Sequence, residues 1–421
     1  MLNQTSVAKT MKLNRPTRPP RVVIVVQNLP VPFDRRVWLE ATSLTKAGYD
    51  VTCICPTGKG FDTTYQVIDG IRVHRYRVPV DANSNLGFLF EFVWCFLRTG
   101  MKLARVATTR GVDVLHICNP PETYFPFAWI VRLAGRKFLF DHHDLSPEMF
   151  EAKIIARPDK ARLSFVERQL RRGLTWCEKQ TFLAANLVIT TNESHKRIAI
   201  ERGKRNPEDV IVVRSGPDLD RLTPTEPVKH WRNGKRFLAA YLGEICEQDG
   251  VDHLVRAMKH LRDDLGATDV HCVFVGGGPH QQVIKDYADE LGVAEICHFT
   301  GRVSDELLSE ILSSADIGVD PDPLTPWSNQ STMNKIMEYM VFELPIVSYN
   351  LDEARVSAQD AALFVEPNDE LALAAGMLEL FHDPDRRREM GKFGRARVED
   401  KLSWAHSEPN LLAAYSILSA S

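Results

Sequence analysis

The alternation of short β-branched runs with helical segments is the feature that most constrains the fold of this chain. Residues 21–27 (RVVIVVQ) form a continuous β-branched run, which is typical of a strand buried on both faces of a parallel sheet. A helix is predicted over residues 35–47, with Asp34 as its N-cap and Gly48 as its stop, and residues 49–55 are the next strand. Because a helix between two parallel strands makes a βαβ unit, an α/β protein is predicted.

This alternation continues along the chain and is interrupted once, at residues 215–233, which contain three prolines and no clear period. Before the interruption, further strands are predicted at 70–77, 112–117, 137–141, 185–190 and 210–213, and helices at 86–106 and 163–182. After it, strands are predicted at 237–242, 270–275, 296–299, 317–319, 345–349 and 361–365, and helices at 250–265, 281–291, 304–314, 370–382, 386–402 and 408–418. We therefore predict two doubly wound, Rossmann-like domains that face a central cleft.

The predicted domains are residues 21–213 and 214–402, after a polar, basic lead-in at 1–20 that we expect to be disordered and not a signal peptide. The chain of 421 residues is 44% hydrophobic and 25% charged, as in ordinary soluble proteins. Its net charge of −3 argues against a dedicated nucleic-acid binder. The 8 cysteines show neither a CxxC pair nor zinc spacing, so we expect reduced thiols and a cytoplasmic location.

The predicted helix at residues 86–106 has an apolar, aromatic face and carries Arg98, Lys102 and Arg105 towards its end. One hypothesis is that this face makes a peripheral contact with the inner face of the cell membrane. The alternative is that the face packs within the protein. No apolar run in the sequence reaches the length of a membrane span.

Ligands of open parallel sheets bind beyond the carboxyl ends of the strands, so the loops there are candidate sites. Gly276, Gly277 and Gly278 would let a ligand approach the backbone, or they form a plain strand-to-helix turn. His142, His143 and Asp144 directly follow a predicted strand, although a surface loop with incidental histidines is the alternative. Arg35 and Arg36 are two further candidates, because they begin a helix, where cations are electrostatically disfavoured. Either they bind an anionic partner or they pair with Asp34 or Glu40.

The stretch at residues 328–350 (SNQSTMNKIMEYMVFELPIVSYN) is predicted to be a helix that Ser331 or Thr332 caps, followed by a buried strand. A helix N-terminus at the cleft would offer N–H groups and partial positive charge to a phosphate. Lys335 adds a full charge, and Glu338 is placed to accept hydrogen bonds from a ribose diol. An amphipathic helix with a solvated polar face is the alternative, and that face carries Asn334, Lys335 and Glu338.

Several motifs together resemble one family. They are PFDRRVWLEATSLTKAGYDVTCICP near the start, FDHHDLSPE, ANLVITTNES, VVRSGPDLD, QDGVDHL, FVGGGP, HFTGRV, STMNKIMEYMVFELPIVSY and the closing SWAHSEPNLLAAYSIL. From about residue 21 onwards the chain is similar to the retaining GT-B glycosyltransferases, specifically the large group 1, family-4 type that builds bacterial polysaccharides and glycolipids. The closing helix at 403–421 resembles the one that crosses back onto the first domain in that fold.

The resemblance implies a nucleoside diphosphate sugar bound mainly by the second domain and a carbohydrate or lipid-linked acceptor on the first. Transfer would retain the anomeric configuration, in polysaccharide biosynthesis, with no cofactor. It would also need no metal; Asp320-Pro321-Asp322 has the letters of a metal-binding acidic pair, but the family does not use it.

The resemblance also assigns roles to residues. Glu338 matches the family's ribose-binding glutamate, His143 matches a histidine that contacts the donor sugar near the reacting centre, and residues 331–335 match the segment that faces the diphosphate. The candidate catalytic residues are His143, Gln330 and Lys335. The candidate donor-binding residues are Gly276, Gly277, Gly278, Arg302, Ser331, Thr332, Asn334, Lys335 and Glu338. The candidate acceptor or cleft residues are Asp34, Arg35, Arg36, His142, Asp144 and Glu148.

The chain departs from the family pattern at three places. Gln330 stands where the family has an acidic residue near the sugar, and Glu343 stands where it usually has a helix-ending glycine. The loop at residues 243–249 lacks the usual Arg and Lys, so Lys335, with Arg214 or Arg302, would have to neutralise the diphosphate. These departures keep two alternatives open, a catalytically weak nucleotide-sugar-binding relative and a sugar-nucleotide epimerase of the same fold.

Overall fold

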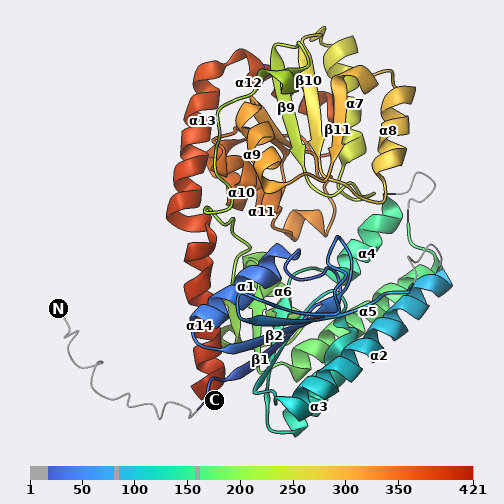
Figure 1. Cartoon of the computed structure of the whole chain (residues 1–421). Helices are drawn as coiled ribbons and strands as arrows, with labels where there is room; N and C mark the ends of the chain where they lie inside the picture. The colour runs from blue at the N-terminus through green and yellow to red at the C-terminus, as the bar shows by residue number, and fades with distance from the viewer. Residues whose placement is uncertain (1–17, 80–84, 157–161, 421) are drawn as a thin grey trace. The chain divides into compact units, whose positions relative to one another are not determined.

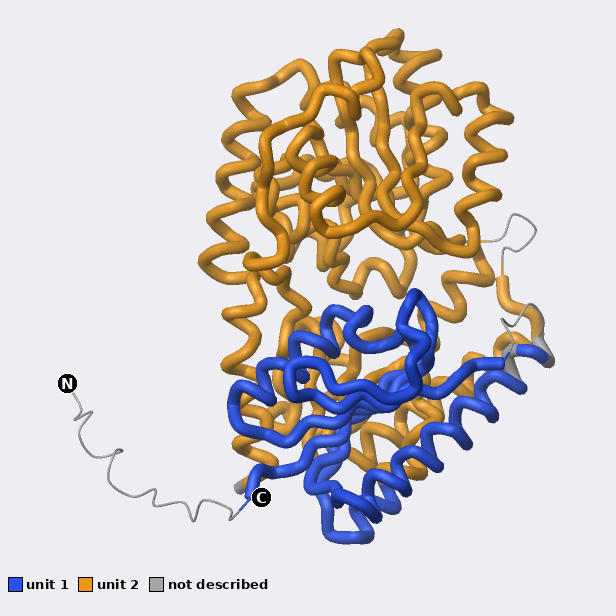
Figure 2. The backbone as a smooth tube through the Cα atoms, viewed as in Figure 1, with its two compact units in different colours: residues 1–117, 129–138 blue, residues 118–128, 139–421 orange. Residues whose placement is uncertain are grey.

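The computed structural model describes residues 18–79, 85–156 and 162–420, and Figure 1 shows its course. Most of the predicted lead-in, residues 1–17, lies outside the described residues. Strands and helices alternate along the chain in two sheets, as the sequence predicts. By its internal contacts the chain divides into unit 1, residues 1–117 with 129–138, and unit 2, residues 118–128 with 139–421 (Figure 2).

The first sheet has eight strands in the order β3-β4-β2-β1-β5-β6-β7-β8. The described strand registers are parallel apart from the antiparallel pair β3–β4. The β-branched run predicts the burial of β1, whose residues from Val22 to Val25 are at most 1% exposed. The strands are β1 (Arg21–Val25), β2 (Asp50–Pro56), β3 (Tyr65–Ile68), β4 (Ile71–Tyr76), β5 (Val114–Cys118), β6 (Lys137–His142), β7 (Leu187–Thr190) and β8 (Val210–Val212).

The edge strand β3 was not predicted from the sequence. Its Tyr65 and Val67 are half exposed, so it lacks the buried β-branched run that marks the other strands. Asp69 and Gly70 join it to β4 with φ of 49° and 81°, and a type I′ hairpin turn requires positive φ at both central residues. The Asp-Gly dipeptide is therefore the signal that identifies this hairpin.

The helices of the first half include several that the hydrophobic period did not predict. Asp34 caps α1 as predicted, because its side chain accepts a hydrogen bond from the Val37 N–H at 3.1 Å. Three short helices, α3, α4 and α6, were not predicted, since fewer than three turns give little periodicity. The helices are α1 (Arg35–Lys46), α2 (Asn85–Thr109), α3 (Phe125–Leu133), α4 (Ser146–Ile155), α5 (Phe165–Ala184) and α6 (Glu193–Glu201).

The second sheet lies in unit 2 and has six strands in the order β11-β10-β9-β12-β13-β14, all parallel. Strands β9, β10 and β12 are central and their residues are almost wholly buried. This sheet therefore supplies a large apolar core. Its strands are β9 (Phe237–Leu242), β10 (Val270–Val275), β11 (Cys297–Gly301), β12 (Ile317–Asp320), β13 (Ile346–Tyr349) and β14 (Ala362–Val365).

The helices of the second half follow the predictions apart from one helix that is split and one that was missed. The predicted helix at 386–402 is α-helical only to Arg397 and continues as a π-helical segment, Val398–Leu402. The short α11 was not predicted. The helices are α7 (Val251–Asp263), α8 (Gln281–Glu290), α9 (Asp305–Ser314), α10 (Asn334–Val341), α11 (Asp352–Ala358), α12 (Glu370–His382), α13 (Pro384–Arg397) and α14 (Trp404–Ala420).

The helices of the described residues can be compared with the length and hydropathy of a membrane span. No helix there, the 25-residue α2 included, combines the length and apolar character needed to cross a bilayer.

Candidate functional site

The glycine loop after β10 is shaped by the neighbouring loop after β9. A Cβ atom at Gly276 would lie 1.8 Å from the carbonyl oxygen of Gly243, and one at Gly278 would lie 2.3 Å from that of Ile245. These two glycines are therefore required by packing between the loops. At Gly277 the nearest atom would be 3.6 Å away, so this position leaves room for a ligand beside the backbone.

The loop after β9 is acidic. It carries Glu244, Glu247 and Asp249, and His280 pairs with Glu247 at 3.2 Å. Burial raises the pKa of Asp249 to about 6. A diphosphate placed here would meet carboxylates, so its charge has to be neutralised by other elements.

Lys335, on α10, is buried beside the carboxyl end of β12 and does not lie on a solvated polar face. Its side chain is 8% exposed, and its Nζ is ion-paired with Asp322 and, at 3.4 Å, with Asp320. The ammonium also lies over the Tyr241 ring, 5.1 Å from the centroid. Burial lowers the pKa of Lys335, but attraction to Asp322 and Asp320 outweighs burial and the pKa is raised. Lys335 is thus a charged group held by the two aspartates at the end of β12.

The predicted cap of α10 is wrong. The helix begins at Asn334, which is exposed, and within the described residues no side chain caps it. Ser331 is committed elsewhere, because its Oγ donates to the Trp327 carbonyl at 2.8 Å. Thr332 Oγ1 and the Gln330 carbonyl both accept from Asn192 Nδ2, at 3.0 and 2.9 Å. Hydrogen bonds to Asn192, which is distant in sequence, therefore replace the capping hydrogen bond that local propensity predicts.

Glu338 is partly exposed on α10 and its carboxylate is held by an arginine. Arg221 donates to Glu338 Oε1 at 3.1 Å and to Asp305 Oδ1 at 2.7 Å. Arg221 lies in the proline-containing linker, and nothing in its local sequence identified it as a site residue. Arg302, another predicted donor-binding residue, is exposed directly after β11.

The two histidines after β6 have different surroundings. His142 is fully buried and lies 3.3 Å from Glu178, and burial lowers its pKa to about 3. A neutral, buried imidazole is not available to an acceptor, so the predicted cleft role of His142 is not supported by its position. His143 is 14% exposed, and its Nε2 is paired with the carboxylate of Asp141. Asn119 Oδ1 accepts from the backbone N–H groups of His143, at 2.5 Å, and Asp144, at 3.2 Å, which fixes this turn.

Glu148, predicted at the acceptor side, is buried in an ionic network. Its Oε1 accepts from Arg202 at 2.6 Å, and Arg202 also pairs with Glu178 at 2.6 Å. Burial raises the pKa of Glu178 to about 7 despite this arginine. Arg202 directly follows α6, and its partners Glu148 and Glu178 are 54 and 24 residues away in sequence, so no local pattern identified it as a site residue.

The helix start in unit 1 shows the pairing that the sequence left open. Arg36 is buried and its Nε lies 3.2 Å from Glu40 Oε1, so an anionic ligand is not needed to explain this cation. Arg35 is exposed, and Asp34 is occupied in capping α1.

Within unit 2, segments that follow β6 and β7 meet the segment before α10. Leu145 and Ala152 form a small apolar cluster with Trp327, against which Met149 and Met333 pack. Asn192, after β7, makes the two hydrogen bonds to the segment before α10 described above. The structure therefore gathers loops at the carboxyl ends of both sheets, where ligands of such sheets bind.

Comparisons with known proteins agree with this architecture. The family described as "Glycosyl transferase 4-like domain" matches residues 34–216, and the family "Glycosyl transferases group 1" matches residues 223–397. The D-inositol 3-phosphate glycosyltransferase of Geodermatophilus obscurus is 26% identical over 282 residues, which are 64% of this chain and 61% of that protein. The chain thus spans about three fifths of the length of that curated relative.

Two solved structures show the same fold at low identity. Sucrose-phosphate synthase from Thermosynechococcus elongatus matches with a TM-score of 0.75 and 18% identity, over 96% of this chain and 100% of that one. Anabaena Alr3699/HepE, solved in complex with UDP-glucose, matches with a TM-score of 0.68 and 15% identity, over 94% of this chain and 99% of that one. With its two parallel-sheet domains, the chain belongs to the group 1 glycosyltransferases of the GT-B fold.

Proposed function

We propose that this protein transfers a sugar from a nucleoside diphosphate sugar to a carbohydrate or lipid-linked acceptor with retention of configuration, in polysaccharide biosynthesis. The observation that carries the proposal is the position of Glu338. Its carboxylate is partly exposed on α10 and is held by Arg221 at 3.1 Å, which pre-organises it to accept hydrogen bonds from a ribose diol. The UDP-glucose bound by Anabaena Alr3699/HepE supports a donor of this class.

In the proposed mechanism the donor binds along the second sheet, with its diphosphate near Gly277 and the start of α10. His143, with its ring fixed by Asp141, contacts the donor sugar. The acceptor hydroxyl attacks the anomeric carbon on the face from which the diphosphate leaves, and the leaving phosphate takes the hydroxyl proton. No enzyme nucleophile is required, and we propose that neither a metal nor a cofactor takes part.

A specific observation favours a second candidate function, a nucleotide-sugar binder with weak catalysis. Lys335 is already neutralised by Asp320 and Asp322, and the loop at 243–249 contains no cation. A leaving diphosphate needs positive charge, and losing one charged donor costs roughly 10²–10³ in rate.

A donor screen with mass detection tests both functions. The full chain is incubated with a panel of UDP-, GDP- and ADP-sugars and simple glycoside acceptors, with and without a chelator. We expect a glycoside product from at least one donor, retained configuration and no effect of the chelator. Tight nucleotide binding without transfer or hydrolysis would favour the weak relative, and conversion of the donor to its epimer would contradict transfer.

The Glu338 role has its own measurement. Glu338→Ala is expected to weaken binding of a nucleoside and of its diphosphate by the same factor, roughly tenfold, because both ligands share the ribose. Calorimetry of the two ligands gives the ratio. A loss confined to the diphosphate would contradict a ribose contact.

We also propose a peripheral membrane contact at the inner face of the membrane through α2. Phe90, Val93, Leu97 and Met101 are between 51% and 63% exposed on this helix. Arg98 and the exposed Arg105 follow on the same helix and would meet anionic lipid. Anionic vesicles are expected to sediment the protein at low salt, and Leu97→Glu with Met101→Glu is expected to weaken this; unchanged sedimentation would exclude α2.

A further inference from the structure

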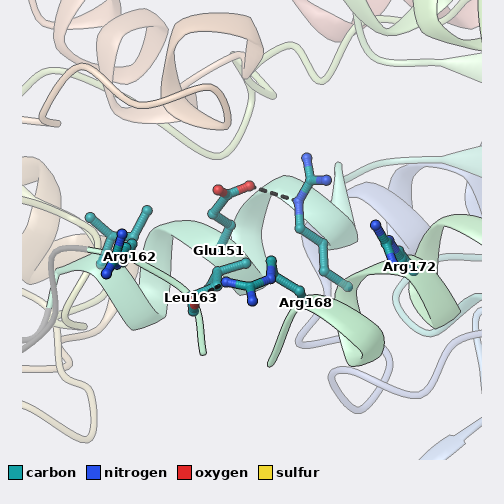
Figure 3. A pocket seen from close by; sticks show the side chains of 7 residues that line it. Glu151, Arg162, Leu163, Arg168 and Arg172 are labelled. Atoms are coloured by element: carbon teal, nitrogen blue, oxygen red, sulfur yellow. Dashed lines mark hydrogen bonds and ion pairs between the residues drawn. The ribbon is translucent and has the colours of Figure 1, made fainter. Parts of the chain in front are cut away.

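Unit 2 contains a pocket of about 400 Å³ between α4 and the start of α5 (Figure 3). In the close-up, Arg162 lies to one side of Glu151 and Arg172 to the other. The pocket is lined by Glu151, Ile155, Arg162, Leu163, Arg168, Arg171 and Arg172. No role proposed above uses these residues.

The charge of the lining is strongly positive. Four arginines face a single glutamate, Glu151, which is taken up by Arg171 at 2.6 Å. Arg168 donates to the Leu163 carbonyl at 2.8 Å. In the described part of the chain, Arg162 and Arg172 form no salt bridge. Guanidinium groups in such a cluster match the geometry of a phosphate and are weakly hydrated.

The spacing of these arginines has a cost that a bound anion would remove. Arg168, Arg171 and Arg172 lie three and four residues apart on α5 and so share one face of the helix. Like charges at this spacing destabilise a helix. The N-terminus of α5 does not supply the anion site, because Ser164 and Glu167 cap it reciprocally. An anion in this pocket would therefore have to be bound by the arginine side chains.

The rim of the pocket is apolar and exposed. Ile155 lines the pocket and is 40% exposed, and Phe165, at the start of α5, is 67% exposed. Phe165 precedes Arg168 by one turn and Arg172 by two turns, on one face of the helix. A cationic pocket bordered by exposed apolar side chains fits an amphiphile with an anionic head.

The pocket is connected to a residue already considered for acceptor binding. Arg171 also lies 3.6 Å from Glu148, near the other end of α4. Seven residues separate Glu148 from Ile155, which is roughly 10 Å along a helix. A ligand with its phosphate in the pocket would thus lie close to the turn that carries His143.

We propose that this pocket binds the phosphate or diphosphate head of a lipid ligand, with the arginines on the phosphate and with Ile155 and Phe165 on the lipid chain. The proposal deepens the proposed function. It rests on that function in one respect, the identification of this lipid as the carrier of the acceptor sugar. Binding itself is measured without turnover, so the two can fail separately.

Vesicle sedimentation of the full chain tests the lipid part. Vesicles of phosphatidylcholine containing phosphatidic acid are expected to bind the protein, and Arg162→Gln with Arg172→Gln is expected to reduce the partition coefficient roughly tenfold or more. The matched control, Arg386→Gln with Arg388→Gln, removes the same charge from α13 and should leave binding unchanged. Equal losses in both double variants, or no loss in the first, would overturn the proposal.

A soluble probe distinguishes phosphate recognition from general attraction to the membrane. Inorganic pyrophosphate is expected to displace the wild-type protein from these vesicles and to raise its melting temperature, and the pocket variant should show neither effect. Ile155→Ser with Phe165→Ser should weaken vesicle binding but keep the pyrophosphate response. Pyrophosphate binding through the arginines without vesicle binding would overturn the lipid assignment. UDP affinity is measured as the folding control, and an unchanged value in every variant would show that each is folded.

Discussion

Lys335 shows how a residue suited to a ligand can be committed to the fold. From the sequence it is the main cation available to a diphosphate, but the structure surrounds its ammonium with Asp320, Asp322 and the Tyr241 ring. Taking three charged groups out of water is tolerated because the opposite charges meet there. Any part that Lys335 plays in donor binding therefore competes with this internal pairing.

We expect Lys335→Met to lower the free energy of unfolding by about 3–5 kcal/mol, because Asp320 and Asp322 would remain buried without a counter-charge. Urea unfolding measures the loss. Adding Asp322→Asn should restore part of it, since one of the two uncompensated charges is removed.

The same variants separate the two roles of Lys335. If Lys335 also binds the diphosphate, UDP affinity should fall more than uridine affinity in Lys335→Met, and Asp322→Asn should not restore it. An unchanged stability together with lost UDP affinity would contradict the structural role.

At the scale of the element, α10 ends under backbone strain. Glu343 follows the helix with φ of +55°, the left-handed region that favours glycine. The family resemblance places a glycine at this position, and the structure confirms that the backbone has the conformation that such a glycine adopts. The exposed side chain of Glu343 contributes little burial to offset the strain.

Glu343→Gly is therefore expected to stabilise the protein by about 1 kcal/mol, because glycine adopts positive φ without a Cβ penalty. Thermal unfolding measures the change. Glu343→Ala is the matched control: it removes the carboxylate but keeps the Cβ, and should give no such gain. Equal stabilisation by both would assign the effect to charge instead of backbone conformation.

The turn after β5 carries a buried carboxyl group that links stability to pH. Glu122 Oε1 accepts from Ser146 Oγ at 2.5 Å and from Asn119 Nδ2 at 2.8 Å. Burial raises the pKa of Glu122 from 4.5 to about 7. Between these two values the folded chain binds more protons at this site than the unfolded chain, so the site's contribution to stability falls as pH rises.

Glu122→Gln is expected to gain stability relative to the wild type as pH rises from 4.5 to 7, by about 3 kcal/mol across the window, because the amide does not ionise. Denaturant unfolding at pH 5 and pH 8 gives the difference between the two proteins. Burial lowers the pKa of His142 to about 3, so the contribution of His142 to stability rises with pH. This contribution is present in both proteins and cancels in the difference between them. A pH-independent difference would contradict the raised pKa.

At the scale of the whole molecule, α14 returns the chain to the first sheet. It contacts β7 and β8, and Asn410 Nδ2 donates to the Val212 carbonyl at 3.0 Å. Leu411 on this helix is fully buried, whereas Ile417 is 46% exposed. The C-terminal helix therefore belongs to the core of unit 2.

Leu411→Ala is expected to lower the free energy of unfolding by about 2–5 kcal/mol, because it leaves a cavity between α14 and its neighbours. Ile417→Ala is the control and should cost much less, since its side chain is half in solvent already. Calorimetric unfolding of both variants measures the contrast. Similar losses would mean that α14 does not pack as described.

The sequence by itself determined the alternation of strands and helices, the two parallel sheets and local features such as the Asp34 cap, because hydrophobic period and capping act within a few residues. Only the tertiary structure decided the burial of His142 and Lys335, the Arg221–Glu338 pair and the arginine pocket. The partners in the Arg221–Glu338 pair are 117 residues apart, and neither side chain has a local preference for the other. Side-chain pairing over such distances follows from how the elements pack, which a local pattern does not contain.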